Sequence, residues 1–267
     1  MSSLGLIAGN GVFPLEVARA AHRRGMRVIA LAHLHETNPE LGDLADEITW
    51  IKVGELQRMI DVLKHANVSE AAMAGGISRA RLVDSFAPDA RALAMLAKVG
   101  RFSDDAVLRA IAGEIEADGI PVIDPVPMLE DALARKGLEA GPAPTPAQMK
   151  DLALAFEVMH ALGGFDIGQA VAVLNGVVAA VEAVEGTDAA LRRGASLVGP
   201  GMVVAKAAKP GQDLRFDRPA IGPATIELLR EIGASMIGVE AHGAMILERA
   251  QTIERARTLG ITLYGHE

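Results

Sequence analysis

The chain has 267 residues, half of them hydrophobic, and carries a formal net charge of −8. A folded protein of this length can hold two ordinary domains, while the acidic balance and the 3% of aromatic residues argue against a general nucleic-acid binder. The absence of cysteine excludes disulfides, thiolate nucleophiles and cysteine-ligated metal sites.

The amino-terminal residues lead directly into the apolar stretch Leu4–Ala8, which is too short for a signal peptide and has no basic flank. No apolar run is long enough to span a bilayer. The sequence therefore predicts a soluble, cytoplasmic protein. Composition does not decide whether it also touches the inner membrane surface.

Short apolar runs alternate with amphipathic segments in the first half of the chain. The expected strands are 4–8, 27–32, 47–53, 69–74 and 121–123, and the expected helices are 14–24, 54–66, 87–99 and 104–118. Such alternation, with largely apolar strands, predicts a parallel sheet covered on both faces. The expected fold class is α/β, with residues 1–136 forming a Rossmann-like substrate- or nucleotide-binding domain.

A proline-rich stretch, 137–147, is the expected linker, and residues 148–267 are expected to form a smaller α+β catalytic domain. Two hairpins are predicted there. One turns at Asn175-Gly176, and the other at 241–243 between runs 235–239 and 244–247. Thr145 is the expected cap of a helix over 146–162, and further helices fit 188–195, 224–233 and 248–259.

The motif Gly9-Asn10-Gly11 follows the first strand, with Phe13 and Pro14 opening the first helix. Glycines allow backbone N–H groups to approach a phosphate, and a helix N-terminus favours an anion. This is not the dinucleotide fingerprint, because Pro14 replaces its third glycine and the second strand ends in Ala32-His33 without an acidic residue for the ribose. We expect a nucleotide loop that is not an NAD site, with a plain glycine turn as the alternative.

Gly75-Gly76 ends the fourth expected strand, on the edge where doubly wound sheets bind ligands. Small residues there let a ligand lie against bare backbone. A simple turn explains the local sequence equally well, so the position at the strand end is what favours binding.

Ser103-Asp104-Asp105 is typical of a helix cap followed by acidic residues in the first turn. That structural interpretation is favoured. The alternative is a polar contact or a metal ligand.

The segment Val184–Asp188 leaves a strand, turns at Gly186 and begins a helix, with Thr187 or Asp188 as the expected cap. A purely structural role explains this pattern. The functional interpretation is that Glu185, Thr187 and Asp188 contact phosphate or metal at the strand end.

The segment Lys206–Pro219 gathers positively and negatively charged side chains beside an apolar run. A solvated, charge-paired loop is the alternative, but two prolines and a glycine restrict its path. Asp213 and Asp217 offer the hard oxygen ligands that suit Mg²⁺. Lys209 and Arg215 would offset charge that develops on a phosphorus centre.

With these residues in place, the chain resembles the LpxI family, the UDP-2,3-diacylglucosamine pyrophosphatases of lipid A biosynthesis, over nearly its whole length. The resemblance rests on the following motifs: Leu4–Gly11 with Phe13-Pro14, Ala74–Ile77, Asp104-Asp105, Ile167-Gly168-Gln169, Val184–Asp188 and Lys209–Asp217. The resemblance implies a Mg²⁺-dependent hydrolase that gives UMP and lipid X, with two domains around a cleft and a homodimer.

On this interpretation Asp213, Asp217, Lys209 and Arg215 are catalytic, and Asp213 and Asp217 bind the metal. The expected substrate-binding residues are Gly9, Asn10, Gly11, Phe13, Gly75, Gly76, Gln169, Glu185, Thr187, Asp188, Gln212, Ala224 and Thr225. The expected partner is a UDP-linked acylated glucosamine. Binding to nucleic acid is not expected.

One position departs from the resemblance. Ala224 lies where relatives carry a polar or acidic residue, so a weakened or inactivated enzyme is a hypothesis. The main alternative function is a non-catalytic sugar-nucleotide sensor. An NAD-linked dehydrogenase is disfavoured by Pro14 and by the missing ribose carboxylate.

Overall fold

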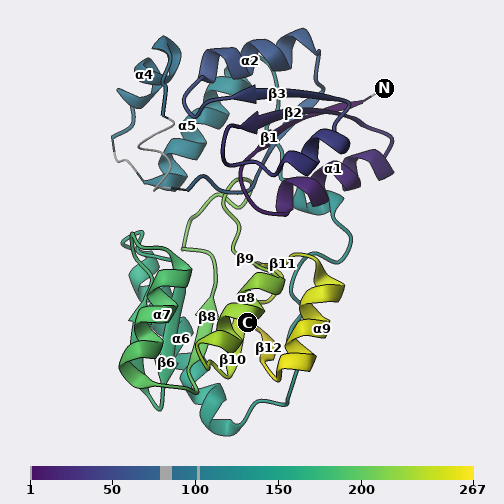
Figure 1. Ribbon diagram of the computed structural model, residues 1–267. Coiled ribbons are helices and arrows are strands. Elements are labelled where there is room, and N and C mark those ends of the chain that lie inside the picture. The colour runs from purple at the N-terminus through teal and green to yellow at the C-terminus, as the bar shows by residue number, and fades with distance from the viewer. Residues whose placement is uncertain (1, 79–85, 101–102) are drawn as a thin grey trace. The chain divides into compact units, whose positions relative to one another are not determined.

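The computed structural model describes residues 2–78, 86–100 and 103–267, which form two compact units (Figure 1). The first unit comprises Met1–Glu130 together with Asp213–Asp217, and the second comprises Asp131–Gln212 together with Arg218–Glu267. The first unit is therefore built from two separate stretches of chain.

The first unit contains a four-stranded parallel sheet in the order β3-β2-β1-β4. Its strands are β1 (Ser3–Ala8), β2 (Arg27–His33), β3 (Glu47–Ile51) and β4 (Glu70–Ala74), and its helices are α1 (Phe13–Arg23), α2 (Leu56–His65), α4 (Ala90–Leu96) and α5 (Asp104–Ala117), with a short 3₁₀ helix over Pro39–Asp43. The predicted α/β class and Rossmann-like parallel sheet are confirmed. The expected strand 121–123 is reduced to an isolated parallel bridge between Val122 and Ala71.

Alternating side chains of the strands pack into two cores, one on each face of this sheet. Leu4 and Leu6 of β1 pack with α1, whereas Ile7 packs with α2, α4 and α5. Because β1 is buried along its whole length, its sequence shows almost no polar positions.

The second unit contains a six-stranded mixed sheet in the order β5-β12-β10-β8-β6-β7. Its strands are β5 (Gly137–Ala140), β6 (Ala170–Leu174), β7 (Val177–Val181), β8 (Val203–Lys206), β10 (Met236–Glu240) and β12 (Thr262–His266); β9 (Ala220–Ile221) and β11 (Met245–Ile246) form a separate parallel pair. Helix α6 (Pro146–Gly163) packs on one face, and α7 (Thr187–Val198), α8 (Pro223–Glu231) and α9 (Arg249–Leu259) pack with the other core.

Local signals placed several of these elements well. The hairpin at Asn175-Gly176 is present, and both residues have positive φ as a tight hairpin turn requires. Thr145 and Gln148 form a capping box at the start of α6, with each side chain bonded to the other residue's backbone N–H.

Two expectations differ from the structure. The predicted linker, 137–147, contains β5, which pairs with β12. The second predicted hairpin is wrong, because β10 pairs with β8 and β12 while β11 pairs with β9. The carboxyl-terminal unit holds the larger sheet, although it is, as expected, slightly the smaller of the two. Within the described ranges, no helix has both the length and the apolar character needed to cross a bilayer.

Candidate active site

The segment Asp213–Asp217 is part of the first unit, and Phe216 anchors it there. The Phe216 side chain is 8% exposed and belongs to the core formed by α2, α4 and α5. The Arg215 guanidinium lies over its ring, 4.6 Å from the ring centroid. A buried aromatic residue in a segment with three charged residues thus fixes the position of the charged side chains beside it.

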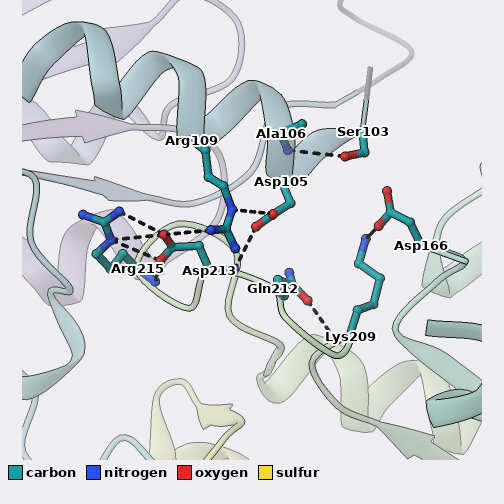
Figure 2. A network of polar contacts seen from close by, with 9 residues as sticks. All are labelled: Ser103, Asp105, Ala106, Arg109, Asp166, Lys209, Gln212, Asp213 and Arg215. Carbon is teal, nitrogen blue, oxygen red and sulfur yellow. Dashed lines mark hydrogen bonds and ion pairs between the residues drawn. The ribbon is translucent and has the colours of Figure 1, made fainter. Parts of the chain in front are cut away.

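A polar network joins this segment to the first turns of α5 (Figure 2). The backbone N–H of Asp213 donates to Oδ1 of Asp105 at 2.8 Å, and Nε of Arg109 donates to Oδ2 of Asp105 at 2.7 Å. Arg109 also lies 3.9 Å from the Asp213 carboxylate. Asp105 therefore does more than supply negative charge to a helix N-terminus, while Ser103 caps that helix by accepting from the Ala106 N–H.

Arg215 is held by several acceptors of the first unit. It donates to Asp213 Oδ2 at 2.9 Å, to Glu116 at 3.0 Å and to the Val122 carbonyl oxygen at 3.0 Å. The hydrogen bond from Arg215 lowers the pKa of the Asp213 carboxyl below its usual range, so this carboxylate is ionised at neutral pH. Its negative charge is balanced by two guanidinium groups.

Lys209 and Gln212 precede this segment and belong to the second unit. The Lys209 ammonium forms an ion pair with Asp166, and both side chains are largely buried. The Gln212 side chain accepts from the Lys209 backbone N–H at 2.9 Å. Lys209 is thus a fixed cation, paired with a carboxylate of the loop that follows α6.

The residues near the start of α7 also lie in the second unit. Glu185 pairs with Arg193 at 2.9 Å, which lowers the pKa of the Glu185 carboxyl. The helix cap is Gly186, not Thr187 or Asp188 as predicted, because both of these already lie in the helix. Thr187 and Asp188 are instead first-turn residues, where an acidic side chain is favourable.

The remaining predicted residues lie at two places in the second unit: Gln169 directly before β6, and Ala224 with Thr225 at the start of α8. Gln169 accepts from the Ala207 N–H through its backbone and donates to Glu182 through its own N–H. Thr225 accepts from the Gly222 N–H at the start of α8. Ala224 is exposed in the first turn of that helix.

The two glycine loops of the first unit contact each other through their backbones. The Gly9 N–H donates to the Ala74 carbonyl oxygen, and the Asn10 N–H donates to that of Gly76, each at 2.8 Å. A Cβ on Gly9 would lie 2.3 Å from the Gly76 oxygen, and one on Gly75, whose φ is +81°, would lie 2.3 Å from the Asn10 oxygen. This close approach explains both glycines structurally. Phe13, the first residue of α1, is partly buried against the core that contains Leu4 and Leu6 of β1.

The oxygen donors of the 213–217 segment fit only part of a magnesium shell. No group of three or more Asp, Glu or His side chains in the described part of the chain could by itself hold a metal ion. Asp213 and Asp217 carry carboxylates of the kind Mg²⁺ takes, one or two at a time, with substrate phosphates completing the shell. Among the described residues, the donor set therefore fits partial coordination of an ion by one or two carboxylates and does not fit a cage made by protein alone.

Within the first unit, the structure brings part of the predicted site together. Asp213 and Arg215 share one network, and the Asp217 N–H bonds to the Asp213 carbonyl oxygen. Reasoning from sequence missed Arg109, although its spacing four residues after Asp105 on a helix was a usable signal. It also missed Glu116, whose pairing with Arg215 is too distant along the chain to leave a local pattern.

Two family models and one curated protein match nearly the whole chain. A family model described as the LpxI N-terminal domain matches residues 3–132, and one described as the LpxI C-terminal domain matches residues 135–264. A protein of Caulobacter vibrioides named UDP-2,3-diacylglucosamine pyrophosphatase LpxI is 34% identical over 282 residues, covering 99% of this chain and 98% of that protein.

Solved structures resemble the chain only partially. The biotin carboxylase domain of a thermophilic 2-oxoglutarate carboxylase has a TM-score of 0.29 and 15% identity, covering 65% of this chain and 30% of its own. The biotin carboxylase subunit of pyruvate carboxylase has a TM-score of 0.29 and 17% identity, covering 64% and 35%. Likenesses this partial carry no weight for the fold or the activity of this chain.

Proposed function

The chain belongs to the LpxI family, and we propose from this membership that it hydrolyses the diphosphate of UDP-2,3-diacylglucosamine. The products are UMP and 2,3-diacylglucosamine 1-phosphate (lipid X), and the reaction is a step of lipid A biosynthesis. The observation that carries the proposal is the match to the Caulobacter vibrioides pyrophosphatase over 99% of this chain.

The charged residues of the 213–217 segment suit this reaction. Water attacks one phosphorus atom, the bond from that phosphorus to the bridging oxygen breaks, and negative charge grows on the phosphoryl oxygens. Arg109 and Arg215 hold Asp213 ionised and in a fixed place. An ionised carboxylate in that place can orient the attacking water or receive its proton. Lys209, fixed by Asp166, supplies a further cation in the second unit.

Magnesium dependence is the second part of the proposal, with Asp213 and Asp217 as the carboxylates that would contact the ion. When bound, Mg²⁺ neutralises the diphosphate and lowers the pKa of a coordinated water. The support is the hard-oxygen character of these side chains. Asp105, bonded to the Asp213 backbone, is the positioning residue for this pair.

We also propose that the protein acts as a cytoplasmic homodimer that touches the inner membrane surface to reach its acylated substrate. The acyl chains of the substrate make a membrane the place where it is found. Light scattering after size exclusion tests the dimer, and sedimentation with phospholipid vesicles tests the surface contact.

A non-catalytic sugar-nucleotide sensor is the alternative function, and the exposed Ala224 in the first turn of α8 is the observation that favours it. A sensor would bind the UDP ligand tightly, leave it intact for hours and tolerate loss of Asp213. An enzyme would release UMP.

The deciding experiment follows UDP-2,3-diacylglucosamine by ³¹P NMR, with Mg²⁺ and with excess EDTA. We expect UMP to appear only with the metal, and Asp213→Asn to abolish the reaction. Asp61→Asn is the matched control, because Asp61 is an exposed carboxylate of α2 that accepts from the Gln57 side chain one turn earlier. Turnover that persists in EDTA would refute the metal. Substrate that stays intact with Mg²⁺ present, in the wild-type protein and in the Ala224→Asp variant alike, would refute the enzyme.

A further inference from the structure

Glu36 is a buried carboxylate at the edge of the first unit where β1 and β2 end. Its side chain is 7% exposed. One carboxylate oxygen, Oε2, accepts from the Asn10 side chain at 2.9 Å. The other, Oε1, is buried and has no hydrogen-bond partner among the described residues. A buried acceptor without a donor is costly, so its retention needs an explanation.

The turn that carries Glu36 is tied to the end of β1. The Thr37 hydroxyl donates to the Ala8 carbonyl oxygen at 2.6 Å, and the His33 ring contacts the same oxygen at 2.9 Å. The Glu36 N–H bonds in turn to the His33 carbonyl oxygen. Glu36 is therefore held at the carboxyl ends of β1 and β2, directed at the Gly9–Gly11 loop through Asn10.

The position matches a general rule of parallel α/β sheets, in which an acidic residue after the second strand binds the ribose hydroxyls of a nucleotide whose phosphates lie at the first helix N-terminus. The sequence appeared to lack this residue because the strand ends in His33. In the structure the acid is present three positions later. An ionised carboxylate accepts hydrogen bonds only, so it selects hydroxyl or N–H donors and repels phosphate.

We propose that Glu36, positioned by Asn10, binds the ribose diol of the uridine nucleotide. The proposal rests on the proposed function for the identity of its ligand, a uridine diphosphate. The amino end of α1 lies beside the same loop, begins at Phe13 and has no side-chain cap, so it is available to the phosphates. Glu36 explains how a loop lacking the dinucleotide fingerprint retains a preference for a ribonucleotide.

The test measures binding of UDP and of 2′,3′-dideoxy-UDP by isothermal titration calorimetry. Wild-type protein is expected to bind UDP about tenfold more tightly or better, the range expected for loss of a hydrogen bond to a charged group. Glu36→Gln should reduce that preference to about twofold or less, and Asn10→Ala should reduce it as well. Glu40→Gln, which removes an exposed carboxylate four positions away, is the control and should keep the wild-type ratio.

Equal binding of both ligands by the wild-type protein, no binding of UDP, or an unchanged ratio in Glu36→Gln would each overturn the proposal. The wild-type comparison needs no substitution, so misfolding of a variant cannot imitate it. Hydrolysis without a ribose preference would defeat this inference alone. A ribose preference without hydrolysis would defeat the proposed enzyme alone.

Discussion

Replacing Arg215 with alanine tests what holds the 213–217 segment on the first unit. The change removes ion pairs with Asp213 and Glu116 and the hydrogen bond to the Val122 carbonyl oxygen. The Arg215 side chain is 37% exposed, so each ion pair is worth only about 0.2–1 kcal/mol. The bond to the carbonyl oxygen adds about 1 kcal/mol.

The contact of Arg215 with the Phe216 ring adds about 0.5–1 kcal/mol, which brings the expected loss to about 2 kcal/mol after allowance for non-additivity. A loss of that size makes local opening about 30-fold more frequent. Hydrogen exchange of the 213–217 amides, followed by mass spectrometry, measures this directly, because the segment can open without unfolding the unit.

The matched control is Arg58→Ala, on α2 of the same unit. Arg58 is 54% exposed and pairs with Glu55 three residues earlier, a contact worth about 0.3–0.5 kcal/mol. Arg215→Lys keeps the charge but loses the planar fork, so its exchange should fall between those of wild type and Arg215→Ala. Equal exchange in Arg215→Ala and Arg58→Ala would refute the reasoning.

Three further outcomes are expected. Ala224→Asp places a carboxylate in an exposed first helical turn, where a carboxylate is tolerated. If a general base is missing at this position, the variant should turn over UDP-2,3-diacylglucosamine about 100-fold faster than wild type. No gain in turnover would contradict the inactivation hypothesis. Phe216→Ala should lower the free energy of unfolding of the intact chain in urea by about 3–5 kcal/mol, whereas Phe216→Leu should keep most of the stability. An unchanged urea midpoint for Phe216→Ala would contradict the anchoring role of Phe216. Burial lowers the pKa of His33 from its ordinary 6.5, so as pH falls the unfolded chain takes up a proton before the folded chain does, and stability decreases below that pH. His33→Gln should therefore reduce the change of melting temperature with pH between about pH 7.5 and pH 5. A pH dependence equal to that of wild type would argue against this role.

Sequence predicted those elements whose signals are local. Alternating apolar runs predicted the parallel strands of the first unit, and Thr145 and the Asn175-Gly176 turn predicted a helix start and a hairpin. Each of these depends on residues within a few positions of one another. The chemistry needed at a cap or a tight turn is the same in every fold.

Pairings between distant residues could not be predicted in this way. The run Met245–Ile246 has the apolar character of a hairpin partner for the preceding strand, but it pairs with Ala220–Ile221. Likewise Glu116 and Arg215, 99 positions apart in the chain, meet beside the point where Phe216 packs into the α2, α4 and α5 core. The sequence marked Lys206–Pro219 as a single charged cluster, whereas the chain passes from the second unit to the first after Gln212 and returns to the second after Asp217.

The discontinuity of the first unit also has a consequence for the order of synthesis. Its core lacks Phe216 until long after Glu130 has been made, since 83 positions separate Glu130 from Asp213. At typical elongation rates of about 5–20 residues per second, that gap lasts about 4–17 s. During this interval the nascent amino-terminal half exposes the apolar surface that Phe216 later covers. On the ribosome, the second unit must therefore be largely synthesised before the first can close its core.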